Sequence, residues 1–257
     1  FRFLKDLAHP NRAVGCTLPA VRQKIKKIIM ETLVTQKVSI VLPPIMIIPD
    51  TKQRIQKAAH DLVMQYSIRS VSMDDIAAHL GMSKKTIYQY FKDKDELVEA
   101  VVDGEIHNNQ CTCNDDRGLA ENAVHEIFLI MDRMVEMFQT MNPSILFDMQ
   151  KYHPAAFRKF QLHRHEYLYN MVKQNLERGI REELYRPEIS IDILSRYRVE
   201  TMLIAFNPEF QRSVKRSLLE IEQEIIIHFL FGVVSQKGYK LVLKYMEQNG
   251  LIKHDKS

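Results

Sequence analysis

A run of basic and hydroxyl side chains between residues 83 and 94 offers the clearest chemistry in this sequence. Lysine ammonium groups and tyrosine hydroxyls bind phosphate, while lysine, threonine and glutamine side chains can hydrogen-bond base edges in the major groove of DNA. If the run begins a helix, its first residues should lie nearest the bases and its tyrosines nearest the backbone. The candidate DNA-contacting residues are Ser83, Lys84, Lys85, Thr86, Tyr88, Gln89, Tyr90, Lys92 and Lys94.

Helix start and stop signals around this run indicate which helices carry its side chains. Ser72 is placed to cap a short helix, Gly81 is placed to end it, and Ser83 is placed to cap the next one. A helix, a tight glycine turn and a second capped helix form a helix-turn-helix. Ile87 and Phe91 are four residues apart and point inward, so the polar residues around them face outward. The spacing therefore predicts a helix-turn-helix over residues 73–90.

The segment TKQRIQKAAHDLVMQYSIRSVSMDDIAAHLGMSKKTIYQYFKDKDELVEAVV resembles the amino-terminal domain of the TetR family of regulators. The matching pieces, in order, are I-A at 76–77, L-G at 80–81, S-K-x-T-I-Y at 83–88, Y-F at 90–91 and K-D-K-D-E-L at 92–97. The resemblance implies backbone-phosphate contacts from Thr86, Tyr88, Tyr90 and Lys94. One residue departs from the family pattern, because Ser67 stands where a glycine usually follows the first helix.

After this segment the apolar pattern stays helical, with breaks at proline and glycine. We expect an all-α protein, with an N-terminal three-helix helix-turn-helix DNA-binding domain at 50–97. A C-terminal helical ligand-binding and dimerisation domain should follow at 98–236, with a C-terminal tail at 237–257. The helices expected after the helix-turn-helix cover residues 94–110, 119–141, 144–151, 154–178, 188–206 and 211–235.

Apolar residues near the end of the second domain form a stripe wider than one core needs. One small helix-turn-helix makes few contacts, whereas two of them about 34 Å apart read consecutive major grooves. These residues are therefore candidates for a homodimer interface, as the resemblance also implies, and the alternative is an ordinary core. The candidate interface residues are Met202, Phe206, Leu218, Ile221, Ile225 and Phe229.

Methionine and aromatic residues are concentrated between residues 131 and 171. Methionine adapts to irregular apolar surfaces and suits permissive pockets, although it also fills ordinary cores. Because the resemblance implies a ligand-controlled switch, we expect a pocket for a small-molecule effector here. Polar contacts would come from Tyr152, His153, His163 or Arg164. The candidate pocket residues are Met134, Phe138, Phe147, Tyr152, Phe160, Tyr167 and Met171.

The net charge does not by itself indicate nucleic-acid binding. The chain carries a formal +4, but the eight basic and three acidic side chains of residues 1–50 account for +5, and the remainder sums to −1. Residues 1–49 show no sustained periodicity, and their proline-rich end cannot continue a helix. We interpret them as a leader that is disordered or precedes a natural start at Met30 or Met46. The alternative is a basic arm that touches DNA.

Other classes of function lack a supporting pattern. Three cysteines are too few for a disulfide framework, and no apolar run reaches the roughly 20 residues that span a bilayer. His107, Cys111 and Cys113 are of metal-ligand type, but a zinc site normally needs four ligands at more open spacing, so we expect a polar loop there. No phosphate-binding glycine loop or nucleophile motif is evident, so we expect no enzyme, no cofactor and no metal.

Together these patterns predict a cytoplasmic, sequence-specific DNA-binding transcriptional regulator. We expect a homodimeric repressor that a small-molecule ligand releases from a palindromic operator in double-stranded DNA, with no membrane partner. The alternative is a DNA-binding architectural or activator protein without a small-molecule effector.

Overall fold

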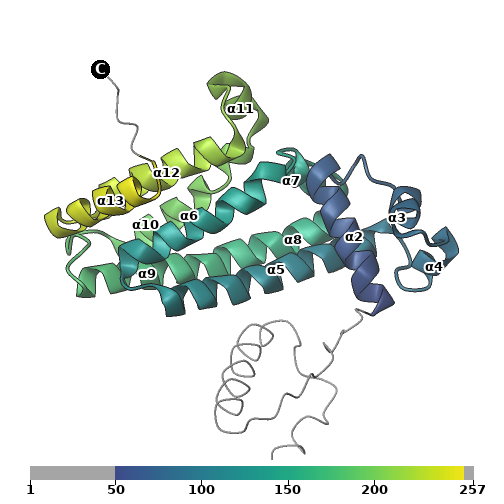
Figure 1. Cartoon of the computed structure of the whole chain (residues 1–257), viewed down its shortest axis with the longest axis horizontal. Helices are drawn as coiled ribbons and strands as arrows, with labels where there is room; N and C mark the ends of the chain where they lie inside the picture. The colour runs from purple at the N-terminus through teal and green to yellow at the C-terminus, as the bar shows by residue number, and fades with distance from the viewer. Residues whose placement is uncertain (1–49, 252–257) are drawn as a thin grey trace, which may run out of the picture.

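The computed structural model describes residues 50–251, so the leader or arm expected at residues 1–49 lies outside the described residues. Within that range the chain is helical, with no strand and only an isolated bridge between Tyr185 and Val234. Short helices form a small head at one end of an elongated helical body (Figure 1). We call residues 50–97 the head and residues 98–251 the body. The all-α fold expected from the sequence is confirmed.

The head consists of α2 (Thr51–Tyr66), α3 (Met73–Leu80) and α4 (Lys84–Tyr88). Ser72 caps α3 in a capping box with Asp75, and Gly81 ends it in the left-handed conformation, with φ of 63°. The Ser83 hydroxyl accepts from the Thr86 backbone N–H at 3.1 Å and so caps α4. The caps and the glycine stop are therefore where the sequence predicts them, although α4 ends at Tyr88, two residues early.

The long helix α5 (Lys94–Leu119) starts in the head and runs the length of the body (Figure 1). It is followed by α6 (Ala123–Thr140), α7 (Ile145–Tyr152), α8 (Pro154–Leu162), the π-helix η1 (His163–Leu168) and α9 (Tyr169–Arg181). The chain then forms α10 (Ile191–Thr201), the 3-10 turn η2 (Ile204–Phe206), α11 (Pro208–Val214), α12 (Leu218–Val233) and α13 (Gln236–Gln248).

Three helix boundaries in the body differ from the sequence prediction. The break expected between residues 110 and 119 is instead part of α5, which continues to Leu119. Gly179 lies inside α9 rather than at its end. The Tyr185 ring packs against its Cα and leaves no room for a side chain, so the glycine serves packing and not helix termination. The single helix expected at 211–235 divides at Lys215, which takes φ of 53°, and Ser217 caps α12 with a capping box.

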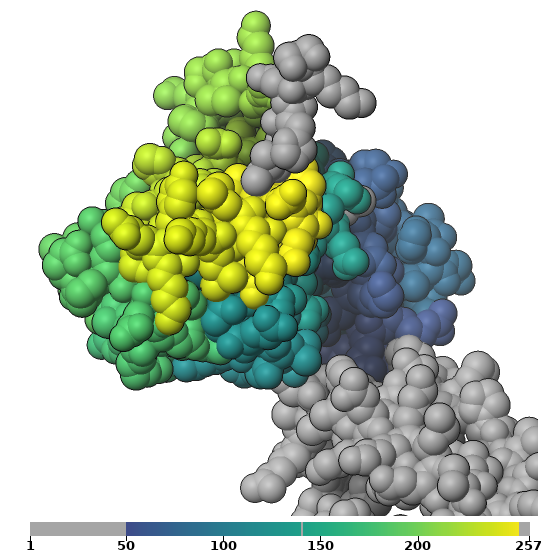
Figure 2. Space-filling model, turned by 60° about the vertical axis from the view of Figure 1, so that its left-hand side comes forward, coloured from purple at the N-terminus to yellow at the C-terminus, as the bar shows by residue number. Residues whose placement is uncertain are grey.

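The tail expected at residues 237–257 contains a further helix, α13. It covers much of one face of the body (Figure 2). Val242 and Tyr245 of α13 are buried against Ile226 and Leu230 of α12. The apolar surplus on α12 is therefore covered within the chain, which bears directly on the expected dimer interface. Along residues 50–251, no helix is both long and apolar enough to cross a membrane.

Candidate functional site

The exposed face of α4 is positioned by two fully buried side chains. Ile87 and Phe91 pack into the head core with Ile55 and Ile76, as the four-residue spacing predicted. A helix of five residues has almost no stability of its own, so its orientation depends on this packing and on the Ser83 cap. The packed core of the head therefore fixes the orientation of this very short helix.

Several predicted DNA-contacting residues face solvent from this mount. Lys85, Gln89 and Lys92 are exposed, and Tyr88 keeps 44% of its surface accessible. Lys84 is exposed too, but its Nζ lies 2.6 Å from Asp74 Oδ2, and this bond raises the pKa of the Lys84 ammonium. The face thus offers ammonium, hydroxyl and amide groups, the set that phosphates and base edges accept.

The other predicted DNA contacts have partners within the chain. The hydroxyls of Ser83 and Thr86 lie 2.8 Å apart at the start of α4, and Tyr90 packs partly into the head core. Lys94 Nζ donates to the Ile68 carbonyl at 2.6 Å, and partial burial lowers the pKa of the Lys94 ammonium. To reach a phosphate, the Lys94 ammonium would have to break its bond to the Ile68 carbonyl. The sequence did not indicate this bond.

A buried hydrogen bond explains the residue that departs from the family pattern. Ser67 ends α2 with φ of 70° and ψ of 158°, a conformation that favours glycine. Its hydroxyl donates to Asp148 Oδ2 at 2.6 Å, and the Arg69 backbone N–H donates to the same oxygen at 3.3 Å. Asp148 belongs to α7, so the serine side chain connects the head to the body across the joint between them.

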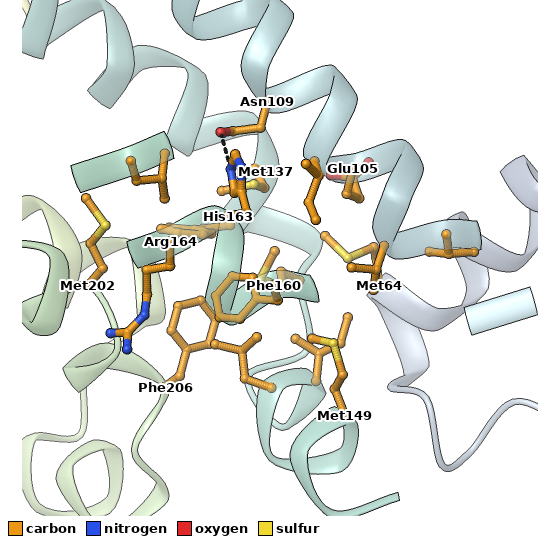
Figure 3. Close-up of a pocket in the computed structure, with 18 of the residues that line it drawn as sticks. Met64, Glu105, Asn109, Met137, Met149, Phe160, His163, Arg164, Met202 and Phe206 are labelled. Atoms are coloured by element: carbon orange, nitrogen blue, oxygen red, sulfur yellow. Dashed lines mark hydrogen bonds between the residues drawn. The ribbon is translucent and has the colours of Figure 1, made fainter. Parts of the chain in front are cut away.

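A largely apolar cavity of about 340 Å³ begins at this joint and runs into the body. Val63, Met64 and Ile68 border it from the head, and Met202 and Phe206 border it from the body. Figure 3 shows Met64 and Met149 toward the head, Met202 and Arg164 toward the opposite end, and the rings of Phe160 and Phe206 between them. Its size is at the lower end of the range for small-molecule sites.

Of the predicted pocket residues, four line this cavity and three do not. Met134, Phe138, Phe160 and Met171 are in the lining. Phe147 and Tyr152 are exposed, because α7 turns Ile145 and Met149 inward instead. The Tyr167 hydroxyl donates to the Gln110 carbonyl at 3.1 Å.

The polar contacts expected in this pocket divide in the same way. His163 and Arg164 line the cavity, whereas Tyr152 is exposed and the imidazole of His153 pairs with Asp95 of α5. Sequence order does not reveal this difference, because all four residues lie near each other along the chain. Only His163 and Arg164, in the π-helix η1, point toward the space between the helices.

The predicted dimer-interface residues pack within the chain: Leu218, Ile221 and Phe229 are buried, and the other three are partly buried. Met202 and Phe206 line the cavity. Leu218 and Ile221 are buried with Phe138, Ile225 packs against them, and Phe229 is buried near α13. Residues of α6 and η2 cover the first half of α12, and α13 joins the cluster only around Phe229. The stripe therefore looked unpartnered because the sequence does not show which helices pack on it.

The cavity lining includes charged groups that the sequence patterns did not single out. Arg198 donates to Glu222 Oε2 at 3.4 Å, and both side chains are buried. Burial raises the pKa of Glu222 to about 7, against the opposing effect of Arg198, and burial lowers the pKa of Arg198. Charged residues in amphipathic helices are usually solvated, so no sequence signal marks this pair.

The residues of metal-ligand type near position 110 lie along one helix. His107, Cys111 and Cys113 all belong to α5. Burial raises the pKa of the Cys113 thiol to about 11, so it stays protonated at neutral pH. Within residues 50–251 there is no group of three or more His, Cys, Asp or Glu side chains that could hold a metal ion.

Comparison with known proteins places the head in a defined family. Residues 55–101 match the model of the bacterial regulatory proteins of the tetR family. The chain is 32% identical over 91 residues to an uncharacterized HTH-type transcriptional regulator, YvaF of Bacillus subtilis, covering 34% of this chain and 47% of that protein. It is 38% identical over 53 residues to the HTH-type regulator SAUSA300_2515 of Staphylococcus aureus, covering 21% and 29%. The chain thus spans less than half the length of these relatives.

Solved structures share the fold beyond the head. A TetR transcriptional regulator from Legionella pneumophila aligns with a TM-score of 0.59 at 16% identity, covering 74% of this chain and all of that one. The ketosteroid transcriptional regulator KstR2 of Mycobacterium tuberculosis aligns with a TM-score of 0.51 at 16% identity, covering 72% and 95%. The match over residues 55–101 agrees with the resemblance seen in the sequence, and the solved structures share the fold.

Proposed function

We propose that this protein binds a palindromic operator as a homodimer, represses transcription there, and leaves the DNA when a small molecule fills the cavity. The observation that carries the proposal is the continuity of the cavity from the head core to the far end of the body. A molecule in that space touches α2 and α5, and α2 packs on α3, which in turn packs on the DNA-reading helix α4. The proposal therefore unites a reader and a switch in one chain.

DNA reading would take place at the exposed face of α4. Lys85 and Gln89 lie on the face that would enter the major groove, where their side chains can reach base edges. Tyr88 and Lys92 flank that face and would bind the phosphate backbone. Lys94 joins them only if DNA draws its ammonium away from the Ile68 carbonyl.

Release would follow from a change in how the head sits on the body. A ligand shifts an equilibrium between head positions only by as much as it binds one of them more tightly. The cavity lining includes the Ile68 and Lys94 side chains, next to the Ser67–Asp148 hydrogen bond that joins the head to α7. Filling the cavity thus acts on the joint, and the spacing of two heads in a dimer changes with it.

A homodimer would need a contact surface other than the predicted interface residues, because those residues pack within the chain. Ile193 and Tyr197 lie four residues apart on α10 and are 66% and 48% exposed, and Ile204 of η2 is exposed beyond them. We propose this apolar face as the contact with a second copy. Ile193→Glu should shift the protein toward monomer in sedimentation velocity, while Ile227→Ala on α12 should leave the dimer intact. An Ile193→Glu protein that stays dimeric contradicts this placement.

Selection of bound DNA from a random pool tests the function as a whole. The expected product is a palindrome whose half-sites lie about one helical turn apart. Lys85→Ala and Gln89→Ala should change which bases are preferred, each base contact contributing about 1–3 kcal/mol. Tyr88→Phe should weaken binding to all sequences alike. Recovery of no common sequence, with uniform coverage in footprinting, would indicate an architectural protein instead.

A further inference from the structure

Two exposed cations at the joint between head and body lie over the same aromatic ring. The guanidinium of Arg69, in the turn between α2 and α3, lies 5.7 Å from the ring centre of Tyr152 in α7. The Lys151 ammonium lies 5.2 Å from the centre of that ring and 5.7 Å from the centre of the Phe147 ring. Because an aromatic ring carries no net charge, such contacts order a cation without neutralising it. We call these four side chains the joint surface.

Within the part of the chain that the structure describes, no acidic side chain pairs with these two cations. Arg69 and Lys151 are both exposed, and neither takes part in an ion pair there. Two carboxylates border the surface, but both are bonded to other groups. Asp148 Oδ2 accepts two hydrogen bonds from the turn after α2, and Asp95 pairs with the imidazole of His153. The two positive charges are therefore available to an anion from outside the chain.

The aromatic rings of the joint surface are those that the sequence predicted inside the pocket. Phe147 and Lys151 lie one turn apart on the face of α7 opposite Ile145 and Met149, which line the cavity. The Phe147 ring therefore faces outward and positions the ammonium. The exposed Tyr152 adds a phenol hydroxyl, which can donate to a phosphate oxygen. A guanidinium, an ammonium and a phenol together form a set suited to phosphate.

Two contacts make the joint surface continuous with the face proposed to bind DNA. Lys94, at the start of α5, donates to the backbone carbonyl that directly precedes Arg69 in the chain. Its neighbour Asp95 pairs with His153, which directly follows Tyr152. α7 itself lies at the end of the body nearest the head (Figure 1). The joint surface therefore borders the start of α5, where a DNA backbone would run.

We propose that the joint surface binds the phosphate backbone of DNA, so that α7 of the body extends the contact made by α4. The charges favour DNA over a second copy of this chain, because a symmetric contact would place like charges opposite each other. Phosphate contacts fix position and carry no sequence information, so this surface adds affinity and not base preference. The inference rests on the proposed function for the DNA site itself and goes beyond it by assigning residues outside the helix-turn-helix.

The salt dependence of DNA affinity tests the proposal on the full chain. Fluorescence anisotropy between about 50 and 200 mM KCl would be measured with the duplex recovered by selection and with a duplex of unrelated sequence. Each phosphate that a protein neutralises contributes about 0.9 to the slope of log affinity against log salt. Arg69→Gln and Lys151→Gln should each reduce the magnitude of that slope by about 0.9, and the double variant by about 1.8, on both duplexes. The preferred bases should not change.

Matched variants separate a local contact from the effect of net charge. Lys244→Gln removes the same charge from an exposed position of α13, at the end of the body away from the head (Figure 1). Lys151→Arg keeps a cation at the joint surface and should retain the native slope. Tyr152→Phe keeps the ring and loses a neutral hydroxyl, so it should weaken binding to both duplexes without changing the slope. Slopes for Arg69→Gln and Lys151→Gln that match the slope for Lys244→Gln overturn the proposal.

The remaining outcomes separate this inference from the proposed function. If the glutamine variants keep the native slope but shift toward monomer in sedimentation velocity, the joint surface contacts a second copy and its assignment to DNA is wrong. If selection recovers a palindrome and the slopes do not change, the surface fails and the operator stands. If selection recovers no common sequence, but the slopes on unrelated DNA fall as expected, the surface stands and the operator fails.

Discussion

The head and the body obtain their functional features in opposite ways. In the head, the decisive contacts join near neighbours in the sequence, such as the Ser72 cap on Asp75 and the Ser83 cap on Thr86. In the body, they join distant residues, such as Arg198 with Glu222, 24 positions apart. The head therefore presents its chemistry outward on a locally specified turn, whereas the body encloses its chemistry by packing.

The same difference appears in the placement of charge. Lys85 and Lys92 of the head are exposed, where a polyanion can reach them. Arg164, Arg198 and Glu222 of the body are buried, where only a small molecule inside the protein can reach them. An exposed basic face and an enclosed cavity thus occur in one chain, joined through α5 and the Ser67–Asp148 bond.

Removing the anchor of α4 should affect the head most strongly. Ile87→Ala leaves a void beneath a five-residue helix and should lower the free energy of unfolding by about 2–5 kcal/mol. Urea unfolding and operator titration would measure the loss of stability and of DNA binding together. Leu119→Ala, at an exposed position of the body, should change stability by less than about 0.5 kcal/mol. Retention of full operator affinity in Ile87→Ala would show that α4 holds its orientation without this anchor.

A matched pair of glycine changes tests the body. Gly179→Ala places a methyl group into the ring of the buried Tyr185, whose hydroxyl donates to Asn175 Oδ1 at 3.0 Å. This overpacking should cost about 1–3 kcal/mol of unfolding free energy. Gly118→Ala in α5 meets open space and should instead add up to about 1 kcal/mol, because alanine favours a helix. Below the melting temperature, neither change should alter operator affinity. Equal effects of the two changes would show that Tyr185 does not constrain α9.

The sequence alone was sufficient to predict the head because its signals are local. Ser72, Gly81 and Ser83 act within one helical turn, so residue type and spacing define the motif without tertiary information. Lys94 is the exception, because its bond to the Ile68 carbonyl crosses the head from one element to another.

Most of the cavity could not be predicted, because its lining comes from helices whose packing the sequence does not state. Met202 and Phe206 have the same apolar character whether they face a cavity or a second subunit. Leu218 and Ile221 likewise look unpartnered along the sequence, although Phe138 of α6 and Ala205 of η2 lie in the same buried cluster. Arg198 and Glu222 gave no signal at all, because charged side chains are rarely buried.

The joint between the two regions should respond to a pair of substitutions at Ser67. Ser67→Ala loses the hydrogen bond to Asp148 and keeps a positive φ, so it should be less stable than the native protein. Ser67→Gly loses the same bond but relieves the backbone, so it should be more stable than the alanine variant by an amount on the order of 1 kcal/mol. Urea unfolding of the two variants gives this difference directly. An alanine variant as stable as the glycine variant would contradict the strained turn.

The smallest expected effect is a pH dependence at the second contact between head and α5. His60 Nε2 of α2 lies 2.9 Å from Glu105 Oε1, and Asp61 lies 3.0 Å from the other ring nitrogen. The bond to Glu105 raises the pKa of His60 above 6.5. The stabilisation is therefore fully present below pH 6.5 and is lost as the pH rises through the folded-state value. We expect the unfolding free energy to fall between pH 5.5 and pH 8.5 by more in the native protein than in His60→Gln. Because the pair is partly exposed, the excess should be less than about 1 kcal/mol. Glu105 also lines the cavity, so this contact lies between α2 and the cavity. A His60→Gln protein with an unchanged pH profile would show that the His60–Glu105 contact does not stabilise the joint.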